Sequence, residues 1–541
     1  MRVSVFLLLS FALLQSCMKS ESVDLVVFNA SIYSLDESNT VHQAMAIRDG
    51  KIIEMGPDRQ ILNKYQYDRS IDAEGKQIYP GFIDAHGHLM SYAELLLGVN
   101  LVGCTSYEEM LERISSYQKL SNRKFIMGSG WDQSLWGVDE LPNNTLLSER
   151  FPNIPICLYR IDGHSALVND AFISLLGEFD SKIRGGEVTL LDERPSGMFI
   201  DAALSVLEPH LPEFSSEEIK TQLKEIQKEL FQYGVTGVHE AGIDFDELNL
   251  LKELVGSDEL KLNIYAMLNP TKENRGFALD HGPYRYKNLS VRSFKAYVDG
   301  ALGSRGALMK KDYSDKAGFQ GLCLTSPEEL AELADFCLET GYQLNSHGIG
   351  DSAIAIILDM CATVYPRRPD HRFRVEHAQI VDLNDIHKFA DYAVLPSVQP
   401  THATTDQRWV MSKLGMERMN GAYAYKSLQE QLGMIALGTD FPVEYVNPFY
   451  TIHSAVHRKN SNGFPKNGFL PNESLTMDKT LKGMTFWATF AAFEEGSVGS
   501  LVPGKKATFV VLNSPLNEGS DFMNNFAWKT VIDGRVVHSL K

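Results

Sequence analysis

The amino-acid sequence predicts an α/β fold, a (β/α)8 TIM barrel with a small β-sandwich formed from both termini. The middle of the chain, residues 80–492, alternates apolar strand-like runs with helical patterns. Both ends of the chain are instead rich in short strand patterns. Alternating patterns favour βα units around a parallel sheet, and eight strands are the number that closes a barrel.

Eight runs qualify as barrel strands. They are Phe82–His86, Val235–Glu240, Leu262–Met267, Arg292–Val298, Gln343–His347, Phe373–His377, Ala393–Val398 and Met434–Asp440. The long gap after the first strand is interpreted as an insertion at about residues 95–225, with strands at Phe125–Gly128 and Ile154–Ile161 and an amphipathic helix at Ser216–Phe231. An insertion at this point emerges on the catalytic face of a barrel, where it can act as a lid or a substrate wall.

The two ends of the chain, residues 23–79 and 493–541, carry matching hairpin signals. Asp49-Gly50 and Asp533-Gly534 each lie between two strand patterns, and Asp-Gly is a strong signal for a two-residue hairpin loop. We therefore predict one β domain built from both termini, with the barrel inserted into it.

The first residues have the character of a signal peptide. Arg2 precedes an apolar run from Val3 to Leu14, which is too short to span a bilayer permanently. The small residue before Cys17 resembles a bacterial lipobox, which predicts a signal peptide over residues 1–16 and lipidation of Cys17. Ordinary secretory cleavage with an unmodified Cys17 is the alternative. In both cases we expect an exported bacterial protein, either periplasmic or anchored to a membrane as a lipoprotein.

Charge and cysteine content exclude some classes of protein. The net charge of −18 leaves no basic excess to neutralise phosphates, so nucleic acid is not an expected partner. The cysteines after Cys17 are Cys104, Cys157, Cys323, Cys337 and Cys361. They are scattered, odd in number and without a CxxC pair, which argues against a disulfide framework or a cysteine zinc site. We expect them to be buried as small hydrophobic residues.

Residues able to bind a metal gather at the ends of the predicted strands. His86 and His88 are two residues apart on a strand, so their imidazoles point to the same side. Further candidates at the ends of later strands are His347, His377 and Asp440, and strand four carries Lys295 inside an apolar run. Active sites of barrels lie at the carboxyl ends of the strands, so these groups are expected to meet around a divalent metal.

This set, in this order, resembles the amidohydrolase superfamily, specifically the amidohydrolase-3 family of YtcJ-like and N-substituted formamide deformylase-like proteins. The matching segments are Pro80–His88, Lys295–Ala307, His347–Asp351, Arg374–Gln379, Ser397–Ala403, Leu437–Val443 and Gly499–Ala507. The resemblance covers nearly the whole chain after the signal. It implies hydrolysis of carbon–nitrogen, amide-type bonds other than peptide bonds in small molecules.

The resemblance also implies the metal ligands. His86, His88, Lys295, His347, His377 and Asp440 would hold one or two divalent ions, with zinc the expected metal. Lys295 would react with carbon dioxide to give a bridging carbamate; the alternative is a lysine paired with a buried carboxylate such as Asp299, and a single metal. Asp440 would act as general acid and base, taking a proton from the attacking water and returning it to the leaving group.

Other polar residues are candidates for binding the substrate. They are His164 and Trp131 in the insertion, His239 at the end of strand two, Arg305 after strand four and His402 after strand seven. A structural role is the alternative for each of them. Arg374 and Glu376 flank His377 and are expected to face the helices.

Two other functions remain open from the residues alone. A lactone or phosphoester hydrolase would use the same metal and barrel, and a non-catalytic surface binding protein would keep the barrel without the chemistry. The membrane enters only through the predicted anchor at Cys17, and the sequence does not indicate an oligomeric state.

Overall fold

The computed structural model describes residues 21–540, apart from residues 122, 139, 162, 182, 184, 185, 213 and 518–521. Cys17 and the predicted signal peptide lie outside the described residues, so both stay predictions. The chain forms two compact units, one of residues 83–230 and 237–492 and one that combines both termini with residues 231–236.

The larger unit contains a parallel sheet of eight successive strands. They are β8 (Phe82–Gly87), β15 (Val235–Ile243), β16 (Asn263–Leu268), β18 (Leu289–Tyr297), β19 (Gln343–Gly348), β20 (Arg374–His377), β21 (Leu395–Val398) and β22 (Ala436–Leu437). The last strand is shorter than predicted. The chain beyond it still meets β8, because Asp440 N donates to His86 O at 2.8 Å and His88 N donates to Phe441 O at 2.9 Å. The predicted barrel is confirmed.

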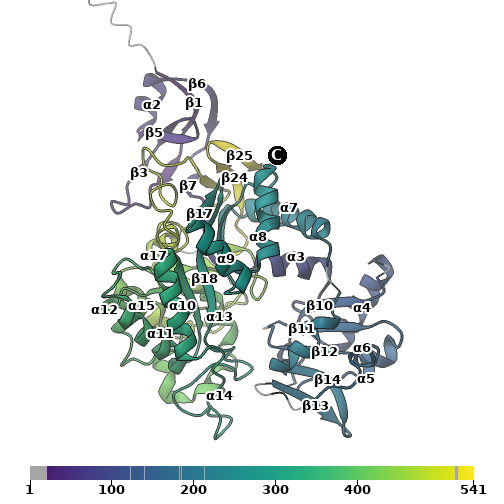
Figure 1. Ribbon diagram of the computed structural model, residues 1–541. Helices are drawn as coiled ribbons and strands as arrows, with labels where there is room; N and C mark the ends of the chain where they lie inside the picture. The colour runs from purple at the N-terminus through teal and green to yellow at the C-terminus, as the bar shows by residue number, and fades with distance from the viewer. Residues whose placement is uncertain are drawn as a thin grey trace, which may run out of the picture. The chain divides into compact units, whose positions relative to one another are not determined.

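Helices follow the strands along the chain. They are α3 (Leu89–Leu97), α7 (Ser216–Gln232), α8 (Phe245–Gly256), α9 (Lys272–His281), α10 (Pro327–Thr340), α11 (Asp351–Val364), α12 (Lys388–Asp391), α13 (Pro400–Asp406), α14 (Val410–Leu414), η4 (Met416–Gly421), α15 (Tyr425–Leu432), α16 (Pro448–His457), η5 (Pro471–Glu473), α17 (Met477–Gly483) and α18 (Phe486–Ala491). A short strand, β17 (Tyr284–Tyr286), pairs with β18. Among the helices, α10 lies beside α11 and α12 lies beside α15 (Figure 1).

Local sequence signals set where several helices begin. Ser326 precedes Pro327 at the start of α10, and its hydroxyl accepts from Glu329 N while the Glu329 carboxylate accepts from Ser326 N. This reciprocal capping satisfies two N–H groups that the helix itself leaves unpaired. A capping box of Asp244 and Glu247 starts α8 in the same way.

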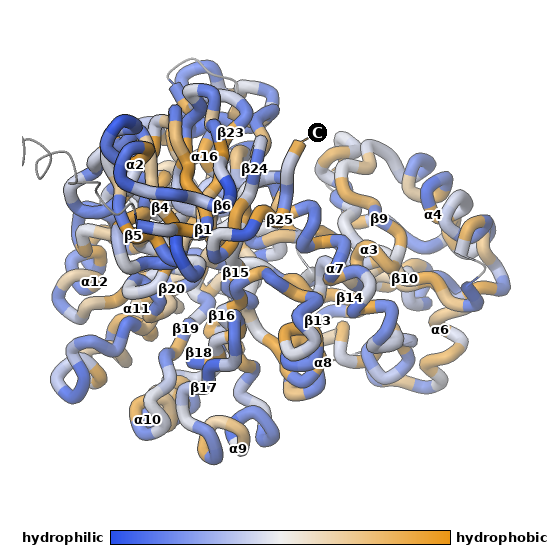
Figure 2. The backbone as a smooth tube through the Cα atoms, turned by 90° about the horizontal axis from the view of Figure 1, so that it is seen from above, coloured by the Kyte–Doolittle hydropathy of each residue, from blue (hydrophilic) through white to orange (hydrophobic). Residues whose placement is uncertain are grey.

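The insertion after β8 and α3 has a sheet of its own. Its strand order is β13 (Gly186–Leu191), β14 (Arg194–Asp201), β12 (Ser165–Val168), β11 (Ile156–Arg160), β10 (Ile126–Trp131), β9 (Val99–Asn100). The helices are α4 (Tyr107–Ser121), η1 (Gln133–Trp136), α5 (Thr145–Arg150), α6 (Asp170–Leu176), η2 (Ala202–Val206) and η3 (Glu208–His210). Figure 2 shows hydrophobic and hydrophilic stretches alternating along α4, as expected for a helix with one face on a core.

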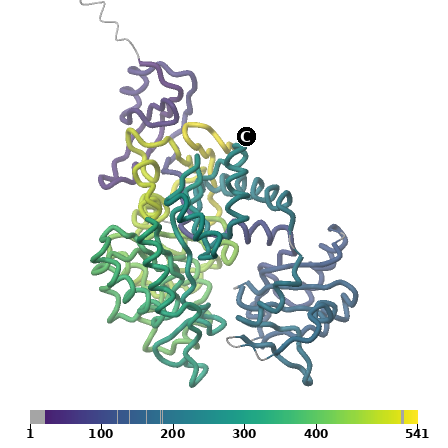
Figure 3. Tube along the Cα trace, in the orientation of Figure 1, coloured from purple at the N-terminus to yellow at the C-terminus, as the bar shows by residue number. Residues whose placement is uncertain are grey.

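The smaller unit is a two-sheet sandwich. One sheet has the order β5 (Lys51–Gly56), β4 (Ala44–Arg48), β1 (Glu21–Phe28), β6 (Tyr65–Asp72), with α2 (Asp58–Lys64) beside it. The other has the order β25 (Arg535–Ser539), β24 (Ala527–Ile532), β23 (Phe509–Leu512), β7 (Gln77–Pro80), β2 (Ser31–Tyr33), β3 (Val41–His42). This second sheet combines N-terminal and C-terminal strands, purple and yellow in Figure 3, because β7 pairs with β23.

One apolar core joins the two sheets of the sandwich. Val27 and Ile47 come from one sheet, and Ile78, Phe509 and Val531 come from the other. The fold class predicted from the sequence is therefore confirmed for both parts, the barrel and the β-sandwich made from both termini.

Two smaller expectations have mixed outcomes. Four of the free cysteines are buried as expected, but Cys323 is exposed. It lies in the long connection between β18 and α10, where little packs over it. Among the described residues, every helix is too short or too polar to cross a membrane.

Candidate metal centre

The first part of the site is a group of three residues. His86 and His88 lie on either side of Gly87 at the end of β8, where a Cβ on the glycine would lie 2.3 Å from the Phe441 ring. Asp440 Oδ1 is 3.6 Å from His86 Nε2 and 3.1 Å from His88 Nε2. Two imidazoles and a carboxylate around one point form a ligand set suited to a divalent metal.

The second part continues from the other oxygen of Asp440. His402 Nε2 is 3.5 Å from Asp440 Oδ2, and His377 Nδ1 is 3.9 Å from the same atom. The ring of His347 lies 4.5 Å from that of His377. The structure thus brings together all the predicted ligands on β8, β19, β20 and after β22, and His402 lies beside them.

The backbone at two of these residues adopts the left-handed region. His377 has φ +75° and Asp440 has φ +63°. Such conformations cost about 1–3 kcal/mol each in residues other than glycine and tend to gather at functional sites. They also direct the two side chains away from the simple alternation of a strand.

Two buried atoms of the predicted ligands lack hydrogen-bond partners within the described part of the chain. They are Asp440 Oδ1 and His347 Nε2. Buried polar atoms are normally satisfied, and leaving one unpaired costs about 1–3 kcal/mol. A divalent cation would satisfy groups of this kind, so the residues fit the metal that the ligand set implies.

Lys295 lies inside this cluster. Its Nζ is 3.1 Å from His86 Nε2, the residue is fully buried, and burial lowers the pKa of the amine to about 8. Asp299, which the sequence suggested as a partner, accepts instead from the backbone N–H groups of Leu308, Ile349 and Gly350.

Arg374 and Glu376 face the barrel interior, so the expectation that they face the helices was wrong. Glu376 Oε2 lies 2.6 Å from His86 Nδ1, and Arg374 Nη1 lies 3.6 Å from Glu376 Oε1. Burial alone would raise the pKa of Glu376, but His86 and Arg374 outweigh it and lower that pKa to about 2. The prediction failed because His377 has positive φ, so its direction does not report the facing of the strand.

Three supporting residues escaped the sequence reasoning. Asp84 accepts from Thr439 N, Thr439 Oγ1 and His86 N, and so fastens β8 to the chain that carries Asp440. Gln399 and Gln379 contact His377 and His402. The available signal was a polar side chain in or just after an apolar strand, two or three residues from a histidine of the site.

The remaining candidates lie in different surroundings. His164 Nδ1 is 3.1 Å from Asp201 Oδ1, and its ring faces the loop at Gly300. Trp131 is buried in the core of the insertion, where Nε1 donates to Leu158 O. His239 is buried in the barrel beside Arg374.

The last of the predicted candidates is Arg305, and Glu240 lies beside another of them, His239. Arg305 forms a two-pronged ion pair with Asp315 at 3.1 and 2.9 Å. Glu240, next to His239, accepts from Leu89 N and Met90 N at the start of α3. Both residues are thus held by neighbouring protein groups.

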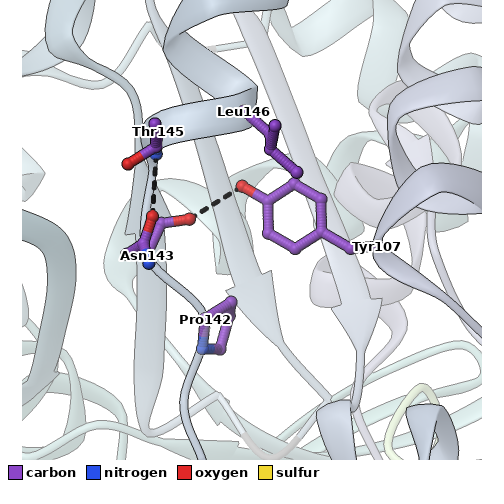
Figure 4. A pocket seen from close by; sticks show the side chains of 5 residues that line it. All are labelled: Tyr107, Pro142, Asn143, Thr145 and Leu146. Atoms are coloured by element: carbon purple, nitrogen blue, oxygen red, sulfur yellow. Dashed lines mark hydrogen bonds between the residues drawn. The ribbon is translucent and has the colours of Figure 1, made fainter.

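A separate surface depression lies in the insertion and is lined by Tyr107, Pro142, Asn143, Thr145 and Leu146 (Figure 4). Tyr107 Oη donates to Asn143 O at 2.9 Å, and Thr145 N donates to Asn143 Oδ1 at 3.1 Å. Its lining offers neither an imidazole nor a carboxylate, so the chemistry belongs to the barrel.

A barrel with a histidine–aspartate cluster at its strand ends is typical of metal-dependent hydrolases. A solved structure of an uncharacterized metal-dependent hydrolase from Pyrococcus horikoshii matches with a TM-score of 0.76 and 26% identity, over 95% of this chain and all of that one. The family model described as "Amidohydrolase family" matches residues 69–538, so this protein belongs to the amidohydrolase family.

Two curated relatives extend the comparison. Protein LONG AFTER FAR-RED 3 of Arabidopsis thaliana is 31% identical over 94% of this chain and 93% of its own length. N-substituted formamide deformylase of Arthrobacter pascens is 24% identical over 91% of this chain and 93% of its own length. The first name states no reaction and the second states one, so the family alone leaves the bond open.

Proposed function

We propose that the protein is a metal-dependent hydrolase that cleaves carbon–nitrogen amide-type bonds, other than peptide bonds, in small molecules. The observation that carries the proposal is the set of buried, unpartnered ligand atoms around Asp440. The similarity to N-substituted formamide deformylase supports the choice of bond.

The metal would be zinc, held by His86, His88 and Asp440, with His347 and His377 as ligands of a second ion. When bound, it lowers the pKa of a coordinated water and polarises the substrate carbonyl. A second ion would need the carbamate at Lys295, whose neutral amine adds to carbon dioxide and releases a proton. The partly deprotonated amine that burial favours supports this modification.

The chain's own residues would manage the protons. Burial raises the pKa of Asp440, but the neighbouring imidazoles of His88, His86 and His377 outweigh it and hold that pKa well below the ordinary value. The carboxylate is therefore ionised at neutral pH and able to accept the proton of the attacking water. As the C–N bond breaks, the Asp440 carboxyl group returns this proton to the leaving nitrogen, giving a carboxylic acid and an amine.

A substrate panel tests the proposal. Zinc-loaded protein would be assayed against N-formyl and N-acyl amines, cyclic amides, lactones and phosphotriesters, with Asp440→Asn as the inactive control. We expect turnover of the C–N substrates. Faster cleavage of lactones or phosphotriesters would show that the protein acts on ester bonds and not on the proposed C–N bond. A protein that neither binds zinc nor turns over any substrate would be a binding protein.

A further inference from the structure

We propose that His402 is a neutral hydrogen-bond donor to the substrate's carbonyl oxygen rather than a metal ligand, with Gln379 as the residue that positions its proton. The inference rests on the proposed hydrolysis of a carbonyl substrate. His402 lies in α13, directly after β21, and its side chain is buried next to Asp440.

The contact with Gln379 determines which nitrogen of His402 carries the proton. Gln379 Nε2 lies 3.1 Å from His402 Nδ1, and both side chains are buried. An amide nitrogen has only hydrogens to offer, so Nδ1 must be the acceptor. A neutral imidazole with Nδ1 as acceptor carries its single proton on Nε2.

The other side of the ring agrees with this assignment. His402 Nε2 faces Asp440 Oδ2 at 3.5 Å and has no hydrogen-bond partner among the described residues. An N–H group facing a carboxylate is attracted to it, whereas a lone pair in the same place would be repelled. Both neighbours of the ring therefore favour the Nε2–H form.

His377 shows the opposite arrangement on a similar ring. The two imidazoles lie 6.0 Å apart and are inclined by only 21°. However, His377 Nδ1 faces an oxygen, Gln399 Oε1, at 2.8 Å, and so must donate. Its Nε2 is left with the lone pair that a metal ligand requires. Gln399 thus leaves His377 able to bind a metal, and Gln379 leaves His402 able to donate a hydrogen bond.

The donor has a place in the hydrolysis. When water adds to a carbonyl carbon, negative charge develops on the carbonyl oxygen, and a preorganised N–H stabilises that charge. The proton stays on His402 Nε2 throughout, so the residue contributes a hydrogen bond and no proton transfer. Removing one donor of this kind costs about 10²–10³-fold in kcat.

The same substitution at the two glutamines tests the inference. In Gln379→Glu the new carboxylate accepts from Nδ1–H and moves the lone pair of His402 to Nε2. We expect kcat to fall about 10²-fold with KM changed less than threefold. In Gln399→Glu the carboxylate accepts the same hydrogen bond from His377 Nδ1–H that Gln399 Oε1 accepts, so the fall in kcat should be at least tenfold smaller. Equal effects of the two variants would overturn the proposal.

Two measurements do not depend on activity. Nitrogen-15 NMR of the wild-type zinc protein, with the His402 signals assigned from His402→Ala, should show the Nε2–H form; the Nδ1–H form would overturn the proposal. Zinc content in His402→Ala should equal that of the wild type, and loss of zinc would make His402 a ligand instead. These readouts remain valid if the C–N substrates fail, so the two proposals are tested separately.

Discussion

The sandwich and the barrel rim differ in the kind of side chain that they bury. Between the two sheets of the sandwich the buried residues are apolar, such as Val27, Ile47 and Phe509. At the rim of the barrel, His347 and Asp440 are buried with ligand atoms that have no hydrogen-bond partner in the described structure. Asp440 is also held in a backbone conformation that non-glycine residues rarely adopt.

This difference indicates what each region contributes. Burial of apolar surface stabilises the sandwich at about 25 cal/mol per Å². The rim lowers the stability of the metal-free protein, because its polar atoms have lost water without gaining a protein partner. We therefore expect substitutions at the rim to change chemistry and metal binding, and substitutions in the sandwich to change stability.

The largest expected effect is on catalysis. Asp440→Asn removes the proton acceptor and weakens a metal ligand, so kcat/KM should fall by 10³-fold or more. Asp533→Asn is a matched control, because Asp533 also has positive φ but lies in a hairpin loop of the sandwich. Steady-state kinetics of both zinc-loaded variants make the comparison. Similar losses in the two would contradict the division of roles.

The next effect concerns stability. Phe509 is fully buried in the sandwich core, and Phe509→Ala should lower the free energy of unfolding by about 3–5 kcal/mol. Denaturant unfolding, followed through a spectroscopic signal from the smaller unit, measures this loss. The folded variant should retain the zinc content of the wild type. A loss of zinc from the folded protein would show that the two regions are coupled.

A smaller effect is expected on metal affinity. Glu376 accepts from His86 Nδ1 and so leaves Nε2 of that imidazole available to a metal. Glu376→Gln should weaken zinc binding about 10–100-fold, measured by competition with a chelator. Removing zinc from the wild type should lower its melting temperature, since a ligand present at 100 times its Kd contributes about 2.7 kcal/mol. Unchanged zinc affinity in the variant would contradict this role.

The smallest effect is a pH-dependent one in the sandwich. Glu54 is bonded to Lys64, Tyr65 and Gln60, and these contacts lower its pKa from 4.5 to about 2. A depressed carboxylate stabilises the folded state above pH 4.5, and this contribution is lost as the pH falls towards 2. Glu54→Gln should therefore cost up to about 1 kcal/mol at pH 7 and progressively less below pH 4.5. A constant difference across this range of pH would contradict the assignment.

Much of the molecule could be predicted from local patterns. The Asp49-Gly50 loop was predictable because Asp-Gly readily adopts positive φ at both positions, as observed. The barrel was predictable from apolar runs alternating with helical patterns. The candidate ligands could be found because histidine, lysine and aspartate are rare at the ends of apolar strands.

The short last strand and the facing of Arg374 and Glu376 could not be predicted. His377 and Asp440 both have positive φ, and the chain at Asp440 makes a contact with a distant strand, because Asp440 N donates to His86 O on β8. Asp84 shows such a contact, since it accepts from His86 N two residues away and from Thr439, which is 355 residues away. Sequence spacing carries no signal for a pairing of that length.

By itself the sequence determined which groups are present, on which strands, and in which order. Only the tertiary structure decided how those groups differ from one another. His377 and His402 are both histidines near strand ends, yet one donates to an oxygen of Gln399 and the other accepts from the nitrogen of Gln379. The chemistry of an imidazole depends on where its proton lies, and neighbours brought together by folding decide that position.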